Sequence, residues 1–98
     1  MKQMKVKVHY LGLVKTYVKK TQEEVELPEG SLLKDLLNKL ASKFGSPFSQ
    51  EVYEQTKKEV KATFMILING ILMGQLEGID TKLRDGDSVM IMPLMTGG

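Results

Sequence analysis

The sequence of 98 residues contains no cysteine, no tryptophan and a single histidine. Without cysteine, the chain has no disulfide, no thiolate metal ligand and no cysteine nucleophile. One histidine, His9, is too few for a histidine-rich metal site or for a proton relay between histidines. We therefore expect no metal site, no bound cofactor and no catalytic nucleophile-and-base set in this chain.

Long apolar runs are also missing. The longest is Phe64–Ile68, far shorter than the ~20 residues that a membrane-spanning helix needs. Residues 1–8 alternate lysine with apolar residues and lack the apolar core of a signal peptide. The composition therefore predicts a single-domain cytoplasmic protein without a membrane partner.

The formal net charge is only +2, but the charges are unevenly distributed. Residues 1–20 contain six lysines and no acid, whereas residues 21–30 contain four glutamates and no base. A nucleic-acid-binding domain presents a basic surface with interleaved aromatic residues. Here the acidic segment can pair with the basic one, so the pattern disfavours a nucleic-acid partner.

Two segments near the N-terminus alternate apolar and polar residues, the pattern of a half-buried strand. Residues 4–10 place Met4, Val6, Val8 and Tyr10 on one face, and residues 23–27 place Val25 and Leu27 on one face. Their opposite charges predict an antiparallel pair with lysine across from glutamate on the solvent face. Each such pair contributes only ~0.2–1 kcal/mol, but it helps to fix the register.

Residues 31–45 have the pattern of an amphipathic helix of three to four turns. Ser31 is the expected N-cap, because its hydroxyl can accept a hydrogen bond from an amide of the first turn. Gly45 is the expected C-terminal cap, with Lys43 well placed in the last turn. The apolar positions are Leu32, Leu33, Leu36, Leu37, Leu40, Ala41 and Phe44.

Residues 46–61 leave two interpretations open. A second helix would bring apolar and small side chains onto one face: Phe48, Val52, Tyr53, Thr56 and Val60. An irregular, solvated connection with two or three buried side chains fits the same residues.

The C-terminal part of the sequence predicts three further strand segments. Phe64–Ile68 is a buried strand, Asn69-Gly70 is a tight turn, and residues 71–76 form a short strand or edge segment. Residues 88–92 form the last strand, with Met90 and Met92 on one face, and Pro93 ends it. The fold class is therefore α+β, with a mixed four- to five-stranded sheet packed on one main helix. One helix covers only one sheet face, so the other face is the place to look for partner contacts.

The sequence finishes with Thr96-Gly97-Gly98. A frayed end or the remnant of an expression tag would explain the two glycines. Alternatively, a Gly-Gly tail has no side chains and can pass through a narrow channel in extended form, so that its carboxylate reaches a reaction centre in a partner.

The chain resembles the MoaD/ThiS family of ubiquitin-like β-grasp sulfur carriers. The resemblance rests on Ile66-Leu67-Ile68-Asn69-Gly70, on Leu83-Arg84-Asp85-Gly86-Asp87-Ser88-Val89, on Pro93 and on Gly97-Gly98. Leu11-Gly12-Leu13-Val14-Lys15 and Leu27-Pro28-Glu29-Gly30-Ser31 extend it into the N-terminal half. The resemblance covers nearly the whole chain except residues 46–61. It implies a single β-grasp domain at 1–93 and a flexible tail at 94–98.

The resemblance also implies a mechanism in which this chain is a carrier or substrate and not an enzyme by itself. An adenylating enzyme of the ubiquitin-activating type uses ATP to adenylate the carboxylate of Gly98, and a persulfide enzyme supplies sulfur to give a thiocarboxylate. The residues implied to thread the partner are Pro93, Leu94, Met95, Thr96 and Gly97. In the MoaD branch, the carrier docks on the molybdopterin synthase large subunit and supplies sulfur for the molybdenum cofactor.

The resemblance places a partner-binding face on the uncovered side of the sheet. Its apolar members are Leu11, Leu72 and Met92, Lys15 is a basic position beside them, and Met90 lies on the same predicted face. Isolated apolar residues on a surface are common and need no explanation, whereas a shared apolar patch indicates an interface.

Three functions remain open at this point. The first is a sulfur carrier, with molybdopterin favoured over tRNA thiolation and thiamine as the destination. The second is a ubiquitin-like modifier joined through Gly98 to lysines of target proteins. The third is a β-grasp interaction domain with a passive tail. Many family members have two prolines preceded by an aromatic residue where this chain has Met92-Pro93-Leu94.

Overall fold

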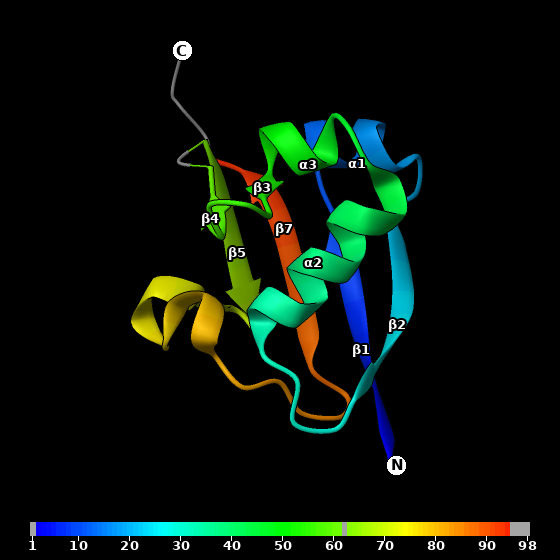
Figure 1. Ribbon diagram of the computed structural model, residues 1–98, viewed down its shortest axis with the longest axis vertical. Helices are drawn as coiled ribbons and strands as arrows, with labels where there is room; N and C mark the ends of the chain where they lie inside the picture. The colour runs from blue at the N-terminus through cyan, green and yellow to red at the C-terminus, as the bar shows by residue number, and fades with distance from the viewer. Residues whose placement is uncertain (1, 62, 95–98) are drawn as a thin grey trace.

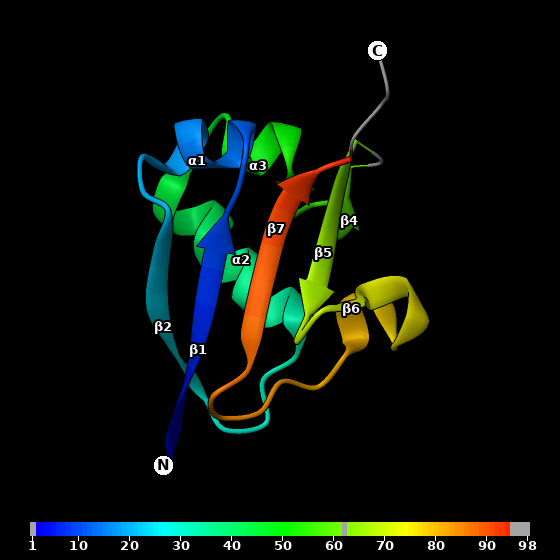
Figure 2. The same ribbon diagram turned by 180° about the vertical axis from the view of Figure 1, so that it is seen from behind.

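A five-stranded mixed sheet forms one layer of the molecule, and a long helix covers one of its faces (Figures 1 and 2). The computed structural model describes residues 2–61 and 63–94. In spatial order the strands are β2 (Gln22–Pro28), β1 (Gln3–Tyr10), β7 (Ser88–Pro93), β5 (Phe64–Ile68) and β6 (Ile71–Leu72). β1 and β7 are parallel and the other neighbours are antiparallel. The sequence pattern predicts this mixed sheet packed on one helix, and its strand order is the ubiquitin-like β-grasp arrangement that the family resemblance implies.

The pairing of β1 with β2 confirms the predicted register. Lys5 lies opposite Glu26, and Lys7 lies opposite Glu24, on the face of the sheet away from the helix. The alternate side chains Met4, Val6, Val8 and Tyr10 are all buried. Opposite charges therefore occupy the solvent side of this pair while its apolar side forms part of the core.

The long helix, α2 (Leu33–Phe44), packs its apolar stripe against the sheet. The prediction that Ser31 caps it is wrong, because the Ser31 hydroxyl donates to the Pro28 carbonyl at 2.7 Å and the helix starts two residues later. Instead, the Asp35 carboxylate accepts a hydrogen bond from the Leu32 amide at 2.7 Å, which links the residue before the helix to the first helical turn. Gly45 ends the helix as expected, with φ 64°.

The segment after this helix is mostly irregular. It contains one helical turn, α3 (Phe48–Glu51), and a small hairpin of β3 (Tyr53–Glu54) with β4 (Glu59–Val60). Phe48, Val52 and Tyr53 are fully buried. The interpretation with two or three buried side chains is therefore the better one, and a second helix running to Val60 is wrong.

The turn at Asn69-Gly70 links β5 to β6 as predicted. Both residues have positive φ, 52° and 84°, as a tight hairpin turn requires. β6 is shorter than the expected 71–76 segment, because the chain leaves the sheet after Leu72 and forms two 3₁₀ turns, η1 (Met73–Gln75) and η2 (Gly78–Asp80). No helix among the described residues is long and apolar enough to cross a membrane.

One short helix was not expected from the sequence. α1 (Leu13–Val18) lies in the connection between β1 and β2, and it buries Val14 and Val18. It sits beside α3 at the end of the molecule where β7 finishes, opposite the end at which β1 begins (Figure 1). α1 therefore lies close to the end of β7.

Candidate functional site

β7 is the central strand of the sheet, and its alternation decides which side chains reach the uncovered face. Val89 and Ile91 are buried in the core, whereas Met90 and Met92 are half-buried on the opposite face. The register places Met92 beside Met65 on β5. Two methionines at alternate positions thus meet apolar neighbours on the adjacent strand.

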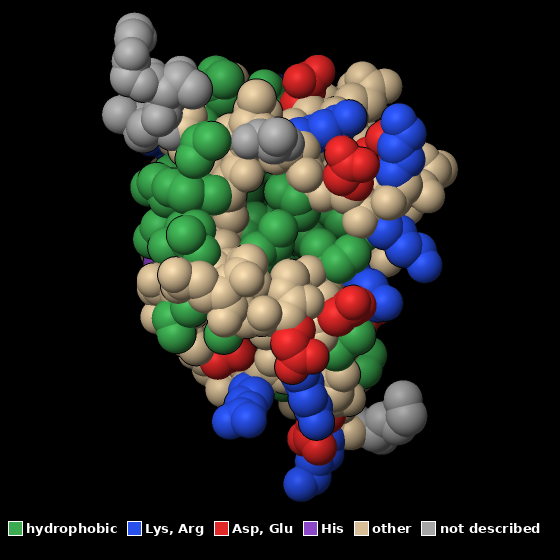
Figure 3. Space-filling model, turned by 90° about the vertical axis from the view of Figure 1, so that its left-hand side faces the viewer, with side chains coloured by type: hydrophobic (Ala, Val, Ile, Leu, Met, Phe, Trp, Pro, Cys, Tyr) green, Lys and Arg blue, Asp and Glu red, His purple; other side chains and the backbone are tan. Residues whose placement is uncertain are grey.

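These neighbours form one continuous apolar surface, which we call the methionine–leucine patch: Met65, Leu67, Leu72, Met90 and Met92. Leu67 is the link, because it pairs with Met90 on one side and with Leu72 on the other. Leu72 is 40% exposed. In Figure 3 the sheet is seen edge-on, and hydrophobic side chains line the left side, where its uncovered face lies. The patch contains no charged group, so it suits an apolar partner surface.

A polar half borders the methionine–leucine patch on the same face. It is formed by the paired side chains of β1 and β2, among them Lys5, Lys7, Glu24 and Glu26. His9 marks the boundary, since it pairs with Met90 across the parallel β1–β7 ladder. The uncovered face is therefore divided into a charged side and an apolar side.

The sequence-predicted residues Leu11 and Lys15 lie at the upper end of this boundary. Together with His9 and Met90 they line a hollow of about 420 Å³ between α1 and the sheet. Leu11 is held there because its amide donates to the Ile91 carbonyl at 3.0 Å. The structure thus brings Leu11 and Lys15 next to Met90, with Met92 and Leu72 in the adjoining patch.

Pro93 and Leu94 form the base of the tail. Leu94 donates its amide to the Thr63 carbonyl at 2.7 Å, which extends the pairing with the β5 side by one residue beyond β7. Pro93 packs against Gly12, the residue before α1, since a Cβ added at Gly12 would lie 2.7 Å from the Pro93 Cγ. The expected tail residues Met95, Thr96, Gly97 and Gly98 lie outside the described residues.

A charged cluster ties the C-terminal end of β1 to α2 behind this site. The Tyr10 hydroxyl donates to the Glu23 carboxylate at 2.6 Å, and Lys43 and Lys20 also bind that carboxylate, at 2.6 and 3.3 Å. Partial burial by itself raises the pKa of Glu23, but the hydrogen bonds from Lys43, Tyr10 and Lys20 outweigh it and lower the pKa. Burial and the bond to Glu23 raise the pKa of Tyr10 far above its ordinary value. The cluster therefore holds a neutral tyrosine and an ionised carboxylate at neutral pH.

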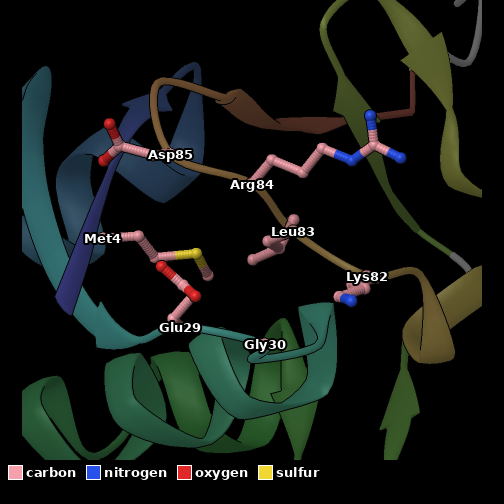
Figure 4. A pocket seen from close by; sticks show the side chains of 7 residues that line it. All are labelled: Met4, Glu29, Gly30, Lys82, Leu83, Arg84 and Asp85. Carbon is pink, nitrogen blue, oxygen red and sulfur yellow. The ribbon is translucent and has the colours of Figure 1, made fainter. Parts of the chain in front are cut away.

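A second hollow, of about 360 Å³, lies near the start of β1 at the other end of the molecule. Figure 4 shows that Arg84 and Asp85 point in different directions, away from Met4 and Leu83. Polar groups that bind a small molecule converge on one point, and these do not. Among residues 2–61 and 63–94, no group of three or more His, Cys, Asp or Glu side chains could hold a metal ion.

Met65 and Leu67 are members of the patch that the sequence interpretation missed. The run Phe64–Ile68 is apolar throughout, so the sequence suggests burial on both faces. In the structure Phe64, Ile66 and Ile68 are buried and the two residues between them are half-buried. The sequence did carry a signal for them. Side chains directly opposite each other on neighbouring strands lie on the same face, so the residues paired with Met90 and Met92 must also lie on the uncovered face.

Comparison with known proteins adds a family and several solved structures. The model of the ThiS family matches residues 8–98. A search of curated proteins gives no match. The solution structure of small archaeal modifier protein 1 from Methanosarcina acetivorans has a TM-score of 0.79 and 24% identity, with 100% of both chains covered.

Two further solved structures are similar over almost the whole chain. A Pyrococcus furiosus protein provisionally named molybdopterin converting factor, subunit 1, has a TM-score of 0.75 and 30% identity, covering 94% of this chain and 99% of that one. Urm1 from Trypanosoma brucei has a TM-score of 0.80 and 22% identity, covering 100% and 99%. The sheet order, the covering helix and the family match over residues 8–98 agree, and the chain belongs to the ThiS family of ubiquitin-like sulfur carrier proteins.

Proposed function

We propose that this chain is a sulfur carrier whose Gly98 carboxylate is adenylated by a ubiquitin-activating-type enzyme and then converted to a thiocarboxylate. The observation that carries the proposal is the position of the methionine–leucine patch. It adjoins the end of central strand β7, so a partner bound to the patch lies beside Pro93, and Gly98 is only five residues further along the sequence. The match of the family model through residue 98 supports Gly98 as the reacting residue.

The chemistry explains why a tail with small residues suits this role. A carboxylate is a poor electrophile, so one carboxylate oxygen first bonds to the α-phosphorus of ATP and pyrophosphate leaves. The terminal sulfur of a persulfide enzyme then attacks the carbonyl carbon and AMP leaves. A thiol reduces the resulting acyl disulfide and releases the thiocarboxylate. The partner supplies the groups that stabilise the developing negative charge, and this chain supplies the docking surface and the carboxylate.

As the sulfur acceptor we propose molybdopterin, with this chain as the small subunit of molybdopterin synthase. The 30% identity to the Pyrococcus furiosus protein named as molybdopterin converting factor, subunit 1, supports this destination. The docking residues of the proposal are Leu11, Lys15, Leu72, Met90 and Met92, joined now by Met65 and Leu67. Methionine side chains adapt to partners of different shape, which suits a carrier that binds an activating enzyme and then a large subunit.

The first experiment measures the mass of the chain. The purified protein is incubated with ATP, a persulfide donor and the ubiquitin-activating-type enzyme of the source organism. The intact mass should rise by about 16 Da as one oxygen is replaced by sulfur, and the gain should map to residues 85–98, the peptide that trypsin releases after Arg84. A variant that lacks Gly98 is the matched control. An unchanged mass with an enzyme that is active on other carriers would contradict the proposal.

The main alternative is a ubiquitin-like modifier joined through Gly98 to lysines, and the similarity to small archaeal modifier protein 1 gives it support. Tryptic digests of cell lysate distinguish the two functions. Because no lysine or arginine follows Arg84, a conjugated lysine would carry the whole of residues 85–98 as a branch. The modifier function would be favoured by two results together: such branched peptides are found, and the thiocarboxylate form of the chain makes no molybdopterin when it is mixed with a large subunit.

A further inference from the structure

A second apolar surface lies at the base of the tail, on the other side of β7 from the methionine–leucine patch. It is a hollow of about 480 Å³, and we call it the tail-base hollow. α1 contributes Leu13 and Tyr17, α3 contributes Glu51, β5 contributes Phe64, β7 contributes Pro93, and Leu94 follows directly after it. Segments distant in sequence thus meet around the point where the tail begins.

The lining of the tail-base hollow is apolar and open to solvent. Leu13 is 57% exposed and Leu94 is 48% exposed, the two largest exposures among the large apolar residues described. The floor is firm, because the Tyr17 and Phe64 rings pack with their centroids 6.5 Å apart. Apolar side chains that gather on an exposed surface mark an interaction site.

A single charged residue lines the tail-base hollow. Glu51 is exposed at its rim and forms no salt bridge with any described residue. The complementary group in a partner is a lysine or arginine next to the apolar side chain. The tail-base hollow therefore differs in charge from the methionine–leucine patch, which has no charged member.

The length of the tail limits which protein can cover the tail-base hollow. Gly98 is four residues beyond Leu94, and four extended residues reach at most about 14 Å. A protein that holds the Gly98 carboxylate in its active site must therefore come within that distance of Leu94. Successive residues of β7 point to opposite faces, so Met92 faces the methionine–leucine patch while Pro93 faces the tail-base hollow.

We propose that the tail-base hollow is a second docking site for the activating enzyme, occupied by a bulky apolar side chain with a basic residue beside Glu51. This inference rests on the proposed function, since it names the protein that adenylates Gly98 as the occupant. The enzyme then holds β7 from both faces of the sheet, and the tail starts from a fixed position. Fixing the start of a short tail lowers the entropy that is lost when the tail enters a channel.

The test measures ATP–pyrophosphate exchange by the purified ubiquitin-activating-type enzyme of the source organism, with the chain as varied substrate. Leu13→Asp should raise the KM for the chain about tenfold and leave kcat within about twofold, because it removes a binding contact and not a reacting group. Leu13 is the first residue of α1, where an acidic residue is favourable, so the fold should be kept. Glu51→Lys should raise the KM as well, and Glu51→Gln should raise it less.

Leu76→Asp is the matched control, because Leu76 is an exposed leucine, 38% exposed, that lies outside the tail-base hollow. It should leave KM and kcat at the wild-type values. Equal KM values for the wild type, Leu13→Asp and Leu76→Asp would overturn the tail-base hollow as a docking site while leaving the proposed function intact. Failure of the enzyme to adenylate the wild-type chain would overturn the proposed function, and with it this occupant. A wild-type dimer that Leu13→Asp converts to a monomer in sedimentation would make a second copy the occupant, and would also overturn the inference.

Discussion

A β-carbon added to Gly12 would lie 2.7 Å from Cγ and 2.9 Å from Cδ of Pro93, a separation that real side chains do not tolerate. Gly12 also has φ 58°, a backbone conformation that favours glycine. This contact joins the loop between β1 and α1 to the last residue of β7. Glycine at position 12 thus allows this loop to lie directly against Pro93.

The first prediction follows from this contact. Gly12→Ala should lower the free energy of unfolding by about 1–2 kcal/mol through the positive φ and the clash. Gly74→Ala is the matched control, because Gly74 has no positive φ and no atom lies within 4 Å of its added Cβ. Denaturant titrations of both variants provide the measurement. Equal stability of Gly12→Ala and the wild type would show that the Gly12–Pro93 contact is easily relieved.

The second prediction concerns the methionine–leucine patch. Met92→Glu should weaken binding to the activating enzyme at least about tenfold, because it buries an unpaired charge in an apolar interface. Its effect on folding should be below about 1 kcal/mol, since Met92 is only half-buried and faces away from the core. Gln3→Glu, on the polar half of the same face, is the control for added negative charge. Calorimetry measures the affinity, and denaturant titration measures the stability. If Met92→Glu does not fold, Met92 belongs to the core and not to the uncovered face of the sheet.

The third prediction concerns the Glu23 cluster and its dependence on pH. The hydrogen bonds from Lys43, Tyr10 and Lys20 outweigh burial and lower the pKa of Glu23 below its unfolded value. A lowered folded pKa stabilises the native state above the unfolded pKa, and that stabilisation is lost as pH falls through the folded pKa. At pH 7, Glu23→Gln should therefore cost about 1.5–3 kcal/mol, the range for hydrogen bonds to a charged group.

The difference between the wild type and Glu23→Gln should shrink as the pH falls below about 4, the usual range of a free glutamate. Thermal unfolding at a series of pH values measures it. Glu29→Gln is a suitable control, because Glu29 is exposed at the turn after β2 and forms no salt bridge with a described residue. A constant difference across the acidic range would show that the cluster acts through packing and not through charge.

Much of the fold follows from local pattern. The alternation of Met4, Val6, Val8 and Tyr10 defines the buried face of β1, and the opposite charges of β1 and β2 agree with their register. Asn69-Gly70 specifies the hairpin because both residues tolerate positive φ. The same alternation in β7 places Met90 and Met92 together on the uncovered face, which is the main part of the candidate site.

The parts that the sequence did not reveal depend on tertiary contacts. α1 has only six residues and two buried side chains, Val14 and Val18, too few for a clear helical period. Phe48, Val52 and Tyr53 are buried through a turn and a small hairpin, and no single periodicity describes them. The tail-base hollow combines residues from α1, α3, β5 and β7, so it becomes visible only after the chain has folded.

The last prediction separates the reactivity of the tail from the stability of the domain. Deleting Gly98 should abolish adenylation, because the carboxylate that remains on Gly97 is one residue, up to about 3.6 Å, short of the reaction centre. The thermal transition should shift by less than about 1 °C, since terminal residues make few packing contacts. Calorimetry and pyrophosphate exchange on the same preparation test both parts, and the wild-type chain purified in the same way serves as the control. A large loss of stability on deletion would mean that the tail packs on the domain, and retained activation would mean that Gly98 is not the reacting residue.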